Sequence, residues 1–415
     1  METVIIIGGG HAGGDSALAI RQAGFQGKIV LVSQESILPY QRPPLSKKFL
    51  AGDVGADTLA IKPSSNYEKA DIEFLPDTAV HSIERAEKRI VTDDSSLSYD
   101  YLVIATGSRA RSVEHPDLPA PVNNLLYLRD LSDSKKLQDQ LIPGNHLVII
   151  GGGYIGLEVA ATAISKGVVV TVLEQQERVL SRVTSPEVSS FYEKVHTDAG
   201  VRVITGAAIK TYKLDTAGEN IVSIELNNGE TLQLDTVLAG IGATPRTELA
   251  EEAGLNIDNG ILVNEFCQTS DPSIYAIGDC SNHYNPICGR RIRLESVPNA
   301  VEQARIAAKA ICGSPSPYTP VPWFWSDQYN LKLQMAGLSQ GYDQCVIRGE
   351  MAEASFVAFY LKHGKILAAD CVNRQPEFAS IKKLVQQQAE VPPEALCSPE
   401  TNLKELIQSV ASGGT

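Results

Sequence analysis

VIIIGGGHAGG occupies residues 4–14 and is typical of a buried β-strand that runs into a glycine-rich turn. Four β-branched residues precede the pattern Gly8-x-Gly10-x-x-Gly13, and a helical pattern follows over residues 16–23. The first glycine permits the tight turn, the second lets backbone amides approach a pyrophosphate, and the third allows the helix to pack closely on the strand. The N-terminus of that helix favours negative charge. The segment therefore predicts a dinucleotide-binding unit.

The same pattern recurs near the middle of the chain. A predicted strand precedes Gly151-x-Gly153-x-x-Gly156, and a helix followed by a second strand is predicted over residues 157–173. A single pattern of this kind is weak evidence, because glycine-rich turns also occur without a nucleotide. Two of them, each between a strand and a helix, indicate two bound nucleotides.

An acidic residue follows the second strand of each unit. Glu174 lies 23 positions after Gly151, and Glu35 lies 27 positions after Gly8, somewhat beyond the roughly 20 positions that are usual. A carboxylate at this place accepts hydrogen bonds from ribose hydroxyls and repels a 2′-phosphate. No arginine stands within the three residues after Glu174, so the second unit is expected to prefer NADH to NADPH.

Further segments carry a family resemblance. They are LPYQRPPLSK at residues 38–47, a strand ending in Ala105-Thr106-Gly107, YAIGD at 275–279, PWFWSDQ at 322–328 and GGGYIGLEVAATAI at 151–164. Together they resemble the oxygenase-coupled NADH:ferredoxin reductases. That family includes the reductases of cytochrome P450 systems, which are the most alike, rubredoxin reductases and the reductases of aromatic-ring dioxygenases.

The resemblance implies an α/β fold with two Rossmann-like dinucleotide-binding domains, arranged as in glutathione reductase, and a C-terminal α+β domain. A linker rich in Pro and Ser at residues 314–320 agrees with the last boundary. Alternating stretches at residues 354–361 and 366–372 predict an antiparallel sheet flanked by helices. The expected domains are a discontinuous FAD-binding domain at residues 1–109 and 244–319, an NAD-binding domain at 110–243 and a C-terminal domain at 320–415.

The resemblance also implies which residues bind each cofactor. In Gly278-Asp279, the second flavin motif, Asp279 is expected to accept a hydrogen bond from a ribityl hydroxyl, with a simple turn as the alternative. The family has an acid directly after LVG, whereas this chain reads LVSQE at residues 31–35, so either Glu35 or Gln34 is expected to meet the FAD ribose. The residues expected to bind FAD are Gly8, Gly10, His11, Ala12, Gly13, Gln34, Glu35, Arg42, Lys47, Val80, Ala105, Thr106, Gly107, Arg129, Gly278, Asp279, Glu295, Ser296, Val297 and Trp325. Those expected to bind NAD are Gly151, Gly153, Tyr154, Ile155, Gly156, Glu158, Glu174 and Gly242.

Three residues are predicted to assist hydride transfer. Lys47 and Glu158 are expected to pair beside flavin N5, hold a cation near the reduced flavin and orient the carboxamide. By position alone, an ordinary acid in the first turn of a helix is the commoner role for Glu158. Tyr154, inside the second glycine turn, is expected to cover the flavin until the nicotinamide displaces it, with core packing as the alternative.

Cysteine usage bears on how electrons leave the flavin. Residues 1–266 contain none of the seven cysteines, so the cysteine relay of disulfide reductases and of NADH oxidases or peroxidases is missing. The spacing of Cys280, His283 and Cys288 lacks the close pairs of a metal site, and no metal is expected. Reduced flavin is therefore expected to pass single electrons to an external carrier.

The expected carrier is a [2Fe–2S] ferredoxin that serves a cytochrome P450. A rubredoxin or the ferredoxin of a ring-hydroxylating dioxygenase is the nearest alternative, and the sequence does not choose among these end users. A slow redox-sensing flavoprotein resembling apoptosis-inducing factor is the candidate from another functional class. Ferredoxins of this type are acidic, so a locally basic stretch is expected to dock them, with an ordinary mixed-charge helix face as the alternative. The expected docking residues are Arg290, Arg291, Arg293, Arg305, Lys309 and Trp325.

The overall charge agrees with a protein partner. Lys and Arg number 36 against 49 Asp and Glu, which gives a formal net charge of −13 and disfavours nucleic acid or an anionic membrane as the main partner. The sequence has no apolar run long enough for a membrane span and no signal-peptide pattern before the first strand. A cytoplasmic protein is therefore expected.

Overall fold

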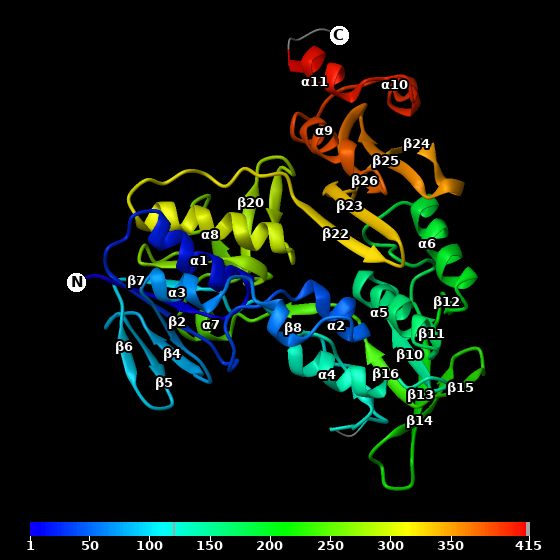
Figure 1. Cartoon of the computed structure of the whole chain (residues 1–415), viewed down its shortest axis with the longest axis horizontal. Coiled ribbons are helices and arrows are strands. Elements are labelled where there is room, and N and C mark those ends of the chain that lie inside the picture. The colour runs from blue at the N-terminus through cyan, green and yellow to red at the C-terminus, as the bar shows by residue number, and fades with distance from the viewer. Residues whose placement is uncertain (119–120, 412–415) are drawn as a thin grey trace. The chain divides into compact units, whose positions relative to one another are not determined.

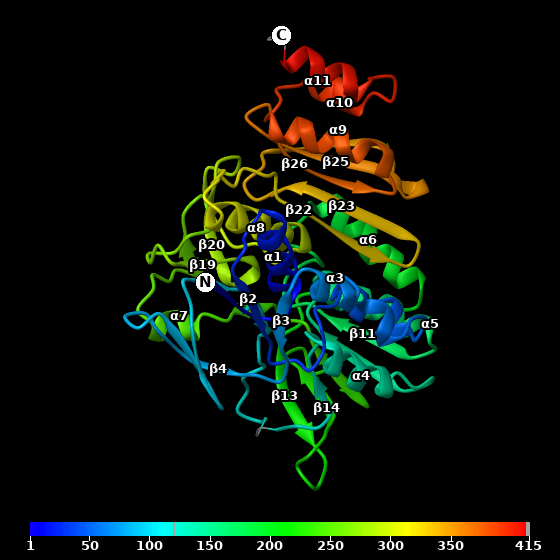
Figure 2. The same cartoon turned by 60° about the vertical axis from the view of Figure 1, so that its left-hand side comes forward.

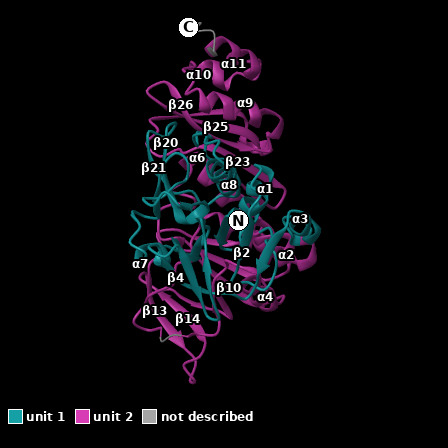
Figure 3. Cartoon of the chain, turned by 90° about the vertical axis from the view of Figure 1, so that its left-hand side faces the viewer, with its two compact units in different colours: residues 1–41, 59–109, 244–324 teal, residues 42–58, 110–243, 325–415 magenta. Residues whose placement is uncertain are grey.

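The chain folds into two compact units in the computed structural model, which describes residues 1–118 and 121–411. Each unit is assembled from segments that are distant in the sequence (Figures 1 and 3). Unit 1 comprises residues 1–41, 59–109 and 244–324, and unit 2 comprises residues 42–58, 110–243 and 325–415. The elements that span joints between these segments are η2 (Ala56–Leu59), β8 (Ser108–Ala110), β17 (Ala243–Pro245) and β22 (Trp323–Gln328).

Unit 1 is built on a five-stranded parallel sheet in the order β19-β7-β1-β2-β3. Its strands are β1 (Thr3–Ile7), β2 (Lys28–Val32), β3 (Ile72–Leu75), β7 (Tyr101–Ile104) and β19 (Ile274–Ala276). The helices of unit 1 are α1 (His11–Gln22), α3 (Ser64–Lys69), α7 (Glu248–Glu252), α8 (Val297–Ile311) and the short η3 (Gly278–Cys280). Val4 and Ile6 of β1 pack in one apolar cluster with α1 and α8, while Ile5 and Ile7 pack in a second cluster. Because β1 is buried on both faces, its sequence is an unbroken apolar run.

Two smaller sheets complete unit 1. One is antiparallel, with strands β4 (Val80–Glu84), β5 (Arg89–Thr92) and β6 (Ser96–Ser98). The other contains β18 (Ile261–Val263), β20 (Ser281–Asn285) and β21 (Arg290–Ile292), with β18 parallel and β21 antiparallel to β20. Several residues expected to bind FAD or a partner lie on these strands.

Unit 2 contains a second five-stranded parallel sheet, in the order β12-β11-β10-β16-β9. Its strands are β9 (Leu125–Leu126), β10 (His146–Ile150), β11 (Val169–Leu173), β12 (Arg202–Ile204) and β16 (Thr236–Ala239). In both sheets, the strand before the glycine turn lies between the strand that follows the helix and a strand from much later in the chain. The prediction of two Rossmann-like folds is therefore confirmed.

The other elements of this part of unit 2 are short or peripheral. The antiparallel sheet β13-β14-β15 and the parallel strands share one apolar cluster. The helices are η1 (Pro43–Ser46), α2 (Lys48–Ala51), α4 (Leu131–Gln140), α5 (Tyr154–Ser165) and α6 (Pro186–Asp198), and the strands are β13 (Ile209–Leu214), β14 (Ile221–Leu226) and β15 (Thr231–Gln233).

The C-terminal part of unit 2 is an α+β layer, as predicted. Its five-stranded sheet has the order β22-β23-β26-β25-β24, and the pairs β23–β26, β26–β25 and β25–β24 are antiparallel. Helix α9 lies across this sheet (Figure 2). The elements are β22 (Trp323–Gln328), β23 (Leu331–Gly337), β24 (Gln344–Glu350), η4 (Met351–Glu353), β25 (Ser355–Lys362), β26 (Lys365–Val372), α9 (Gln375–Gln386), α10 (Pro393–Cys397) and α11 (Leu403–Ala411).

A buried carboxyl connects the C-terminal sheet to the loop that follows β11. Asp370 on β26 is 3% exposed, and its Oδ2 accepts hydrogen bonds from Thr184 Oγ1 and Tyr360 OH, both at 2.6 Å. The backbone N–H of Ser185, at the start of α6, donates to Tyr360 OH at 3.2 Å. Burial raises the pKa of the Asp370 carboxyl to about 6, although both hydrogen bonds favour the ionised form.

We expect that Asp370→Asn makes the free energy of unfolding less dependent on pH. The carboxyl has a reference pKa of 3.8 and a folded pKa of about 6, so the folded state binds the proton more tightly. Stability of the wild type should therefore fall as the pH rises from about 4 to about 6, by up to ~3 kcal/mol. Asparagine keeps an acceptor oxygen for Thr184 and Tyr360, and it carries no charge.

Thermal unfolding of wild type and Asp370→Asn across this pH range is the measurement. The difference in unfolding temperature should shift in favour of the variant up to about pH 6 and stay constant above it. Two curves that remain parallel at every pH would contradict the assignment. Glu353→Gln, which removes an exposed carboxyl from the same layer, is the matched control.

Among the residues that the structure describes, no helix has the length and the apolar character needed to cross a membrane.

Candidate functional site

The first glycine turn lies at the carboxyl end of β1, beside the residue that follows β7. Gly8 has a φ of +120°, and a Cβ atom there would overlap with the carbonyl oxygen of Ala105. A Cβ atom on Gly13 would overlap with the carbonyl oxygen of Gly8. Glycine is therefore required at both positions, as the sequence pattern predicts.

The second turn repeats this geometry in unit 2. Gly151 has a φ of +109°, and a Cβ atom there would overlap with the carbonyl oxygen of Gly240, which follows β16. A Cβ atom on Gly156 would overlap with the carbonyl oxygen of Gly151. A Cβ atom on Gly153, by contrast, would have no neighbouring atom within 4 Å, so its side of the turn faces open space. That open side suits the close approach of a pyrophosphate.

The two helices that follow the turns have no side-chain cap, which is also true of α2, α3, α7, α9 and α10. Helix α1 starts after Gly10 and α5 starts after Gly153. Helices α4, α6 and α8 are capped by the side chains of Asp130, Ser185 and Ser296. Phosphate groups of a bound dinucleotide would satisfy N-terminal amides that no side chain caps. Both turns therefore fit a dinucleotide.

Glu174 lies where a ribose-binding carboxylate is expected. It directly follows β11, and its two oxygens accept hydrogen bonds from the backbone N–H groups of Gly152 and Gln176, both at 2.8 Å. The carboxylate is thus fixed against the glycine turn and only half-buried. This arrangement supports the predicted preference for NADH.

Ser33 takes the corresponding position in unit 1. It directly follows β2, and a Cβ atom on Gly9 would contact its side chain, as one on Gly152 would contact Glu174. Of the two candidates for the FAD ribose, Glu35 accepts a hydrogen bond from Tyr40 OH at 2.5 Å, and Gln34 Oε1 accepts one from Arg246 at 3.1 Å. The assignment of the ribose to either residue stays a prediction.

The second flavin motif lies beside the first glycine turn. A Cβ atom on Gly278, whose φ is +75°, would lie 2.9 Å from Cβ of Ala12 in the first turn of α1. Asp279 accepts a hydrogen bond from Ser108 Oγ at 2.9 Å. Segments that are 266 residues apart in the sequence, 278 against 12, are thus adjacent in unit 1.

The remaining predicted FAD residues are divided between the units. In unit 1, His11 is the first residue of α1 and Val80 is the first residue of β4. Thr106 Oγ1 donates to the carbonyl oxygen of Arg246, and Gly107 has a φ of +70°. Helix α8 begins at Val297, directly after Glu295 and Ser296. In unit 2, the guanidinium of Arg42 donates to the carbonyl oxygen of Arg129 at 2.9 Å, and Trp325 lies on β22.

Of the predicted NAD residues, Ile155 is exposed at the start of α5, and the carbonyl of Gly242 accepts from the N–H of Arg111.

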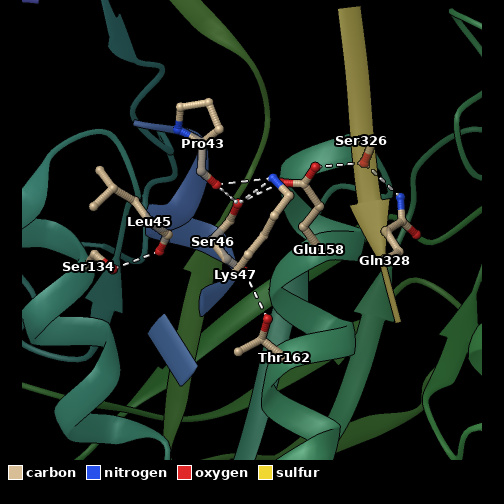
Figure 4. A network of polar contacts seen from close by, with 9 residues as sticks. All are labelled: Pro43, Leu45, Ser46, Lys47, Ser134, Glu158, Thr162, Ser326 and Gln328. Carbon is tan, nitrogen blue, oxygen red and sulfur yellow. Dashed lines mark hydrogen bonds and ion pairs between the residues drawn. The ribbon is translucent and has the colours of Figure 1, made fainter. Parts of the chain in front are cut away.

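Lys47 and Glu158 form a buried ion pair within unit 2 (Figure 4). Lys47 Nζ lies 2.6 Å from Glu158 Oε2, and the two side chains are 17% and 5% exposed. Ser46 Oγ donates to Glu158 Oε2 at 2.6 Å, and Ser326 Oγ donates to Oε1 at 2.6 Å. Thr162 Oγ1 donates to the carbonyl of Ser46 at 2.9 Å and so fixes the segment before Lys47 to helix α5. The structure thus places two of the three predicted catalytic residues, Lys47 and Glu158, in contact, and their catalytic role stays a prediction.

Tyr154 is directed toward the C-terminal sheet. Its hydroxyl donates to Met335 Sδ on β23 at 2.8 Å. Burial, together with the nearby Asp370 carboxyl, raises the pKa of Tyr154 well above its usual range. The phenol therefore stays protonated and acts as a hydrogen-bond donor at neutral pH.

The expected docking residues differ in how they are held. Arg305 and Lys309 are exposed one turn apart on α8, and Arg305 lies 3.3 Å from Glu302. Arg291 is exposed on β21 but donates to the carbonyls of Val263 and Asn282. Arg293 is only 12% exposed and pairs with Glu295 at 2.6 Å. Its guanidinium also donates to the carbonyl of Asp279, so it supports the second flavin motif and presents little charge at the surface.

Sequence comparisons identify the family. Residues 2–304 match the family described as pyridine nucleotide-disulphide oxidoreductase, and residues 323–407 match the family described as reductase C-terminal. The chain belongs to the pyridine nucleotide-disulphide oxidoreductases. This oxidoreductase is 43% identical over 415 residues to putidaredoxin reductase CamA of Pseudomonas putida, with 98% of the chain and 97% of the relative covered.

Solved structures of related oxidoreductases agree with the fold. The chain matches the reductase of the covalent putidaredoxin reductase–putidaredoxin complex with a TM-score of 0.95 and 43% identity, over 99% of each chain. It matches the ferredoxin reductase for the CYP199A2 system from Rhodopseudomonas palustris with a TM-score of 0.93 and 39% identity, over 98% of this chain and 99% of that chain. The predicted resemblance to the ferredoxin reductases is confirmed.

The cysteines of this pyridine nucleotide-disulphide oxidoreductase are all free thiols. Cys280, beside the second flavin motif, is fully buried, and burial raises the pKa of its thiol. Burial also lowers the pKa of His283 to about 4. Within residues 1–118 and 121–411, no group of three or more His, Cys, Asp or Glu side chains is arranged to hold a metal ion.

Proposed function

We propose that the protein is an FAD-dependent NADH:ferredoxin reductase, whose carrier is a [2Fe–2S] ferredoxin that serves a cytochrome P450. The observation that carries the proposal is the pair of glycine turns, each with an uncapped helix and, in unit 2, a carboxylate fixed for a ribose. The relatives named for putidaredoxin and for a P450 system support this choice of partner. Residues 1–109 and 244–319 would hold FAD, and residues 110–243 would hold NADH.

Bound FAD supplies the chemistry of accepting a hydride from NADH and of releasing single electrons. The amides at the starts of α1 and α5 bind the two pyrophosphates, and Glu174 binds the ribose of NADH. The ammonium group of Lys47 is paired with the Glu158 carboxylate in a site from which most water is excluded. There it stabilises the negative charge that develops on the flavin during reduction. Because residues 1–266 contain no cysteine, the chain lacks the cysteine relay that disulfide reductases carry in their first segment.

An anaerobic titration of the purified protein with NADH tests the proposal. The flavin spectrum should bleach on addition of NADH, and cytochrome c should then be reduced rapidly only when a [2Fe–2S] ferredoxin is added. A protein that binds no flavin would contradict the proposal, and slow turnover with every ferredoxin would favour a redox-sensing role. A rubredoxin and the ferredoxin of a dioxygenase belong in the same assay, because they separate the three end users. The seven free thiols suit the reducing cytoplasm, where we propose that the protein acts.

We expect Arg305→Glu to weaken docking of an acidic ferredoxin. Arg305 is 61% exposed on α8, and reversing one charge on an electrostatic docking surface typically slows association by about tenfold. The Michaelis constant for ferredoxin should rise, while reduction of ferricyanide should be unchanged. Arg89→Glu is the matched control, because Arg89 is an exposed arginine of unit 1 that also pairs with a glutamate. Equal losses with ferredoxin and ferricyanide would contradict the docking role.

A further inference from the structure

Ser326 contacts the Lys47–Glu158 ion pair. Neither the glycine pattern nor the predicted catalytic residues indicate this contact. Ser326 lies on β22 and is 1% exposed, and its Oγ donates to Glu158 Oε1 at 2.6 Å (Figure 4). The other carboxylate oxygen, Oε2, is occupied by Ser46 and Lys47. Among the described residues, Ser326 is the one donor to Oε1. The orientation of the Glu158 carboxylate therefore depends on donors from both sides.

Ser326 is in turn held by a string of hydrogen bonds. Gln328 Nε2 donates to Ser326 Oγ at 3.2 Å, and Gln328 Oε1 accepts from His196 Nε2 at 2.8 Å. The other ring nitrogen of His196, Nδ1, lies 3.0 Å from Tyr329 OH. Ser326, Gln328 and His196 are all buried, whereas Tyr329 is 38% exposed. The string thus runs from the surface to Glu158.

Each residue of this string donates its hydrogen bond toward Glu158. The amide oxygen of Gln328 needs a hydrogen from His196 Nε2, so the neutral ring carries its hydrogen there and Nδ1 accepts from Tyr329 OH. Burial lowers the pKa of His196, which favours this neutral ring. With its oxygen so occupied, Gln328 presents N–H to Ser326, and the single hydroxyl hydrogen of Ser326 is left for Glu158.

We infer that Ser326 is a positioning residue for hydride transfer, which orients the Glu158 carboxylate and thereby Lys47, with Gln328 and His196 fixing its hydroxyl. The inference rests on the proposed function, since it assigns Ser326 a part in the reduction of FAD by NADH. Without Ser326, Oε1 would be a buried acceptor with no donor, and the carboxylate would turn to find one. Lys47 Nζ would follow, because it is bound to the same carboxylate. The C-terminal layer, which supplies β22, thus contributes to the site.

The test is Ser326→Ala in the FAD-loaded full-length protein, measured by stopped-flow reduction with NADH. The limiting rate should fall by about tenfold, as expected for the loss of one hydrogen bond to a charged group, and the half-saturating NADH concentration should stay the same. Ser326→Thr keeps the hydroxyl and should restore the rate. Ser165→Ala, which removes an exposed hydroxyl from the same helix as Glu158, should reduce at the wild-type rate.

A second measurement does not depend on turnover. The carboxylate stretching bands of Glu158, identified by their loss in Glu158→Gln, should shift in the infrared spectrum of Ser326→Ala and not in that of Ser165→Ala. An unshifted band, or a Ser326→Ala rate equal to that of the wild type, would overturn the inference. A loss that threonine does not restore and that accompanies a lower unfolding temperature would also overturn it, because the role would then be structural. Failure of the wild type itself to be reduced by NADH would instead reject the proposed function.

Discussion

Purified Gly13→Ala is expected to contain little or no FAD. A Cβ atom at this position would overlap with the carbonyl oxygen of Gly8 and would lie 3.4 Å from Cδ1 of Leu31. Helix α1 would have to move away from β1 to make room, which costs ~1–3 kcal/mol in packing alone. The same movement withdraws the N-terminal amides of α1 from the pyrophosphate. The ratio of flavin absorbance to protein absorbance measures the effect directly.

Gly153→Ala is the matched control for this substitution. Gly153 has an ordinary φ of −83°, and a Cβ atom there would have no neighbouring atom within 4 Å. The same methyl group should therefore leave the fold and the FAD content unchanged. Because Gly153 lies in the second turn, its methyl group should instead weaken NADH binding by about tenfold. A Gly13→Ala protein with the flavin content of the wild type would show that the first turn does not hold FAD.

The parts of the structure that could be predicted from the sequence are those fixed by local constraints. The turn at Gly8 requires a backbone that only glycine adopts easily, and Gly13 requires the absence of a side chain. Both requirements for glycine fall within residues 8–13, so a short sequence pattern is enough to predict them. The unbroken apolar run of β1 likewise records burial on two faces.

The contacts that were missed join segments far apart in the chain. Ser326 meets Glu158 across 168 positions, and Asp370 meets Thr184 across 186. Serine and aspartate are common surface residues, so neither reveals by its type that it is buried. The one available signal was that Ser326 lies in PWFWSDQ, a segment that carries the family resemblance. Arg293 illustrates the opposite case, since a basic stretch predicts exposure and the side chain is largely buried.

Lys47→Ala is expected to lower the limiting rate of flavin reduction by NADH by ~10²-fold, the typical effect of removing one preorganised charged donor. Stopped-flow absorbance at saturating NADH measures that rate. Lys48→Ala is the control, because Lys48 is the exposed neighbour on α2. A rate equal to that of the wild type would remove Lys47 from the mechanism.

The single variant alone does not separate chemistry from stability. Glu158 is 5% exposed, so Lys47→Ala leaves a buried carboxylate without its cation, which typically costs ~3–5 kcal/mol. In the double variant Lys47→Ala/Glu158→Gln, the charge is gone and much of the stability should return. If the ion pair serves only the fold, the double variant should recover the rate along with the unfolding temperature. If Lys47 stabilises the charge that develops during reduction, the double variant should be stable and still slow.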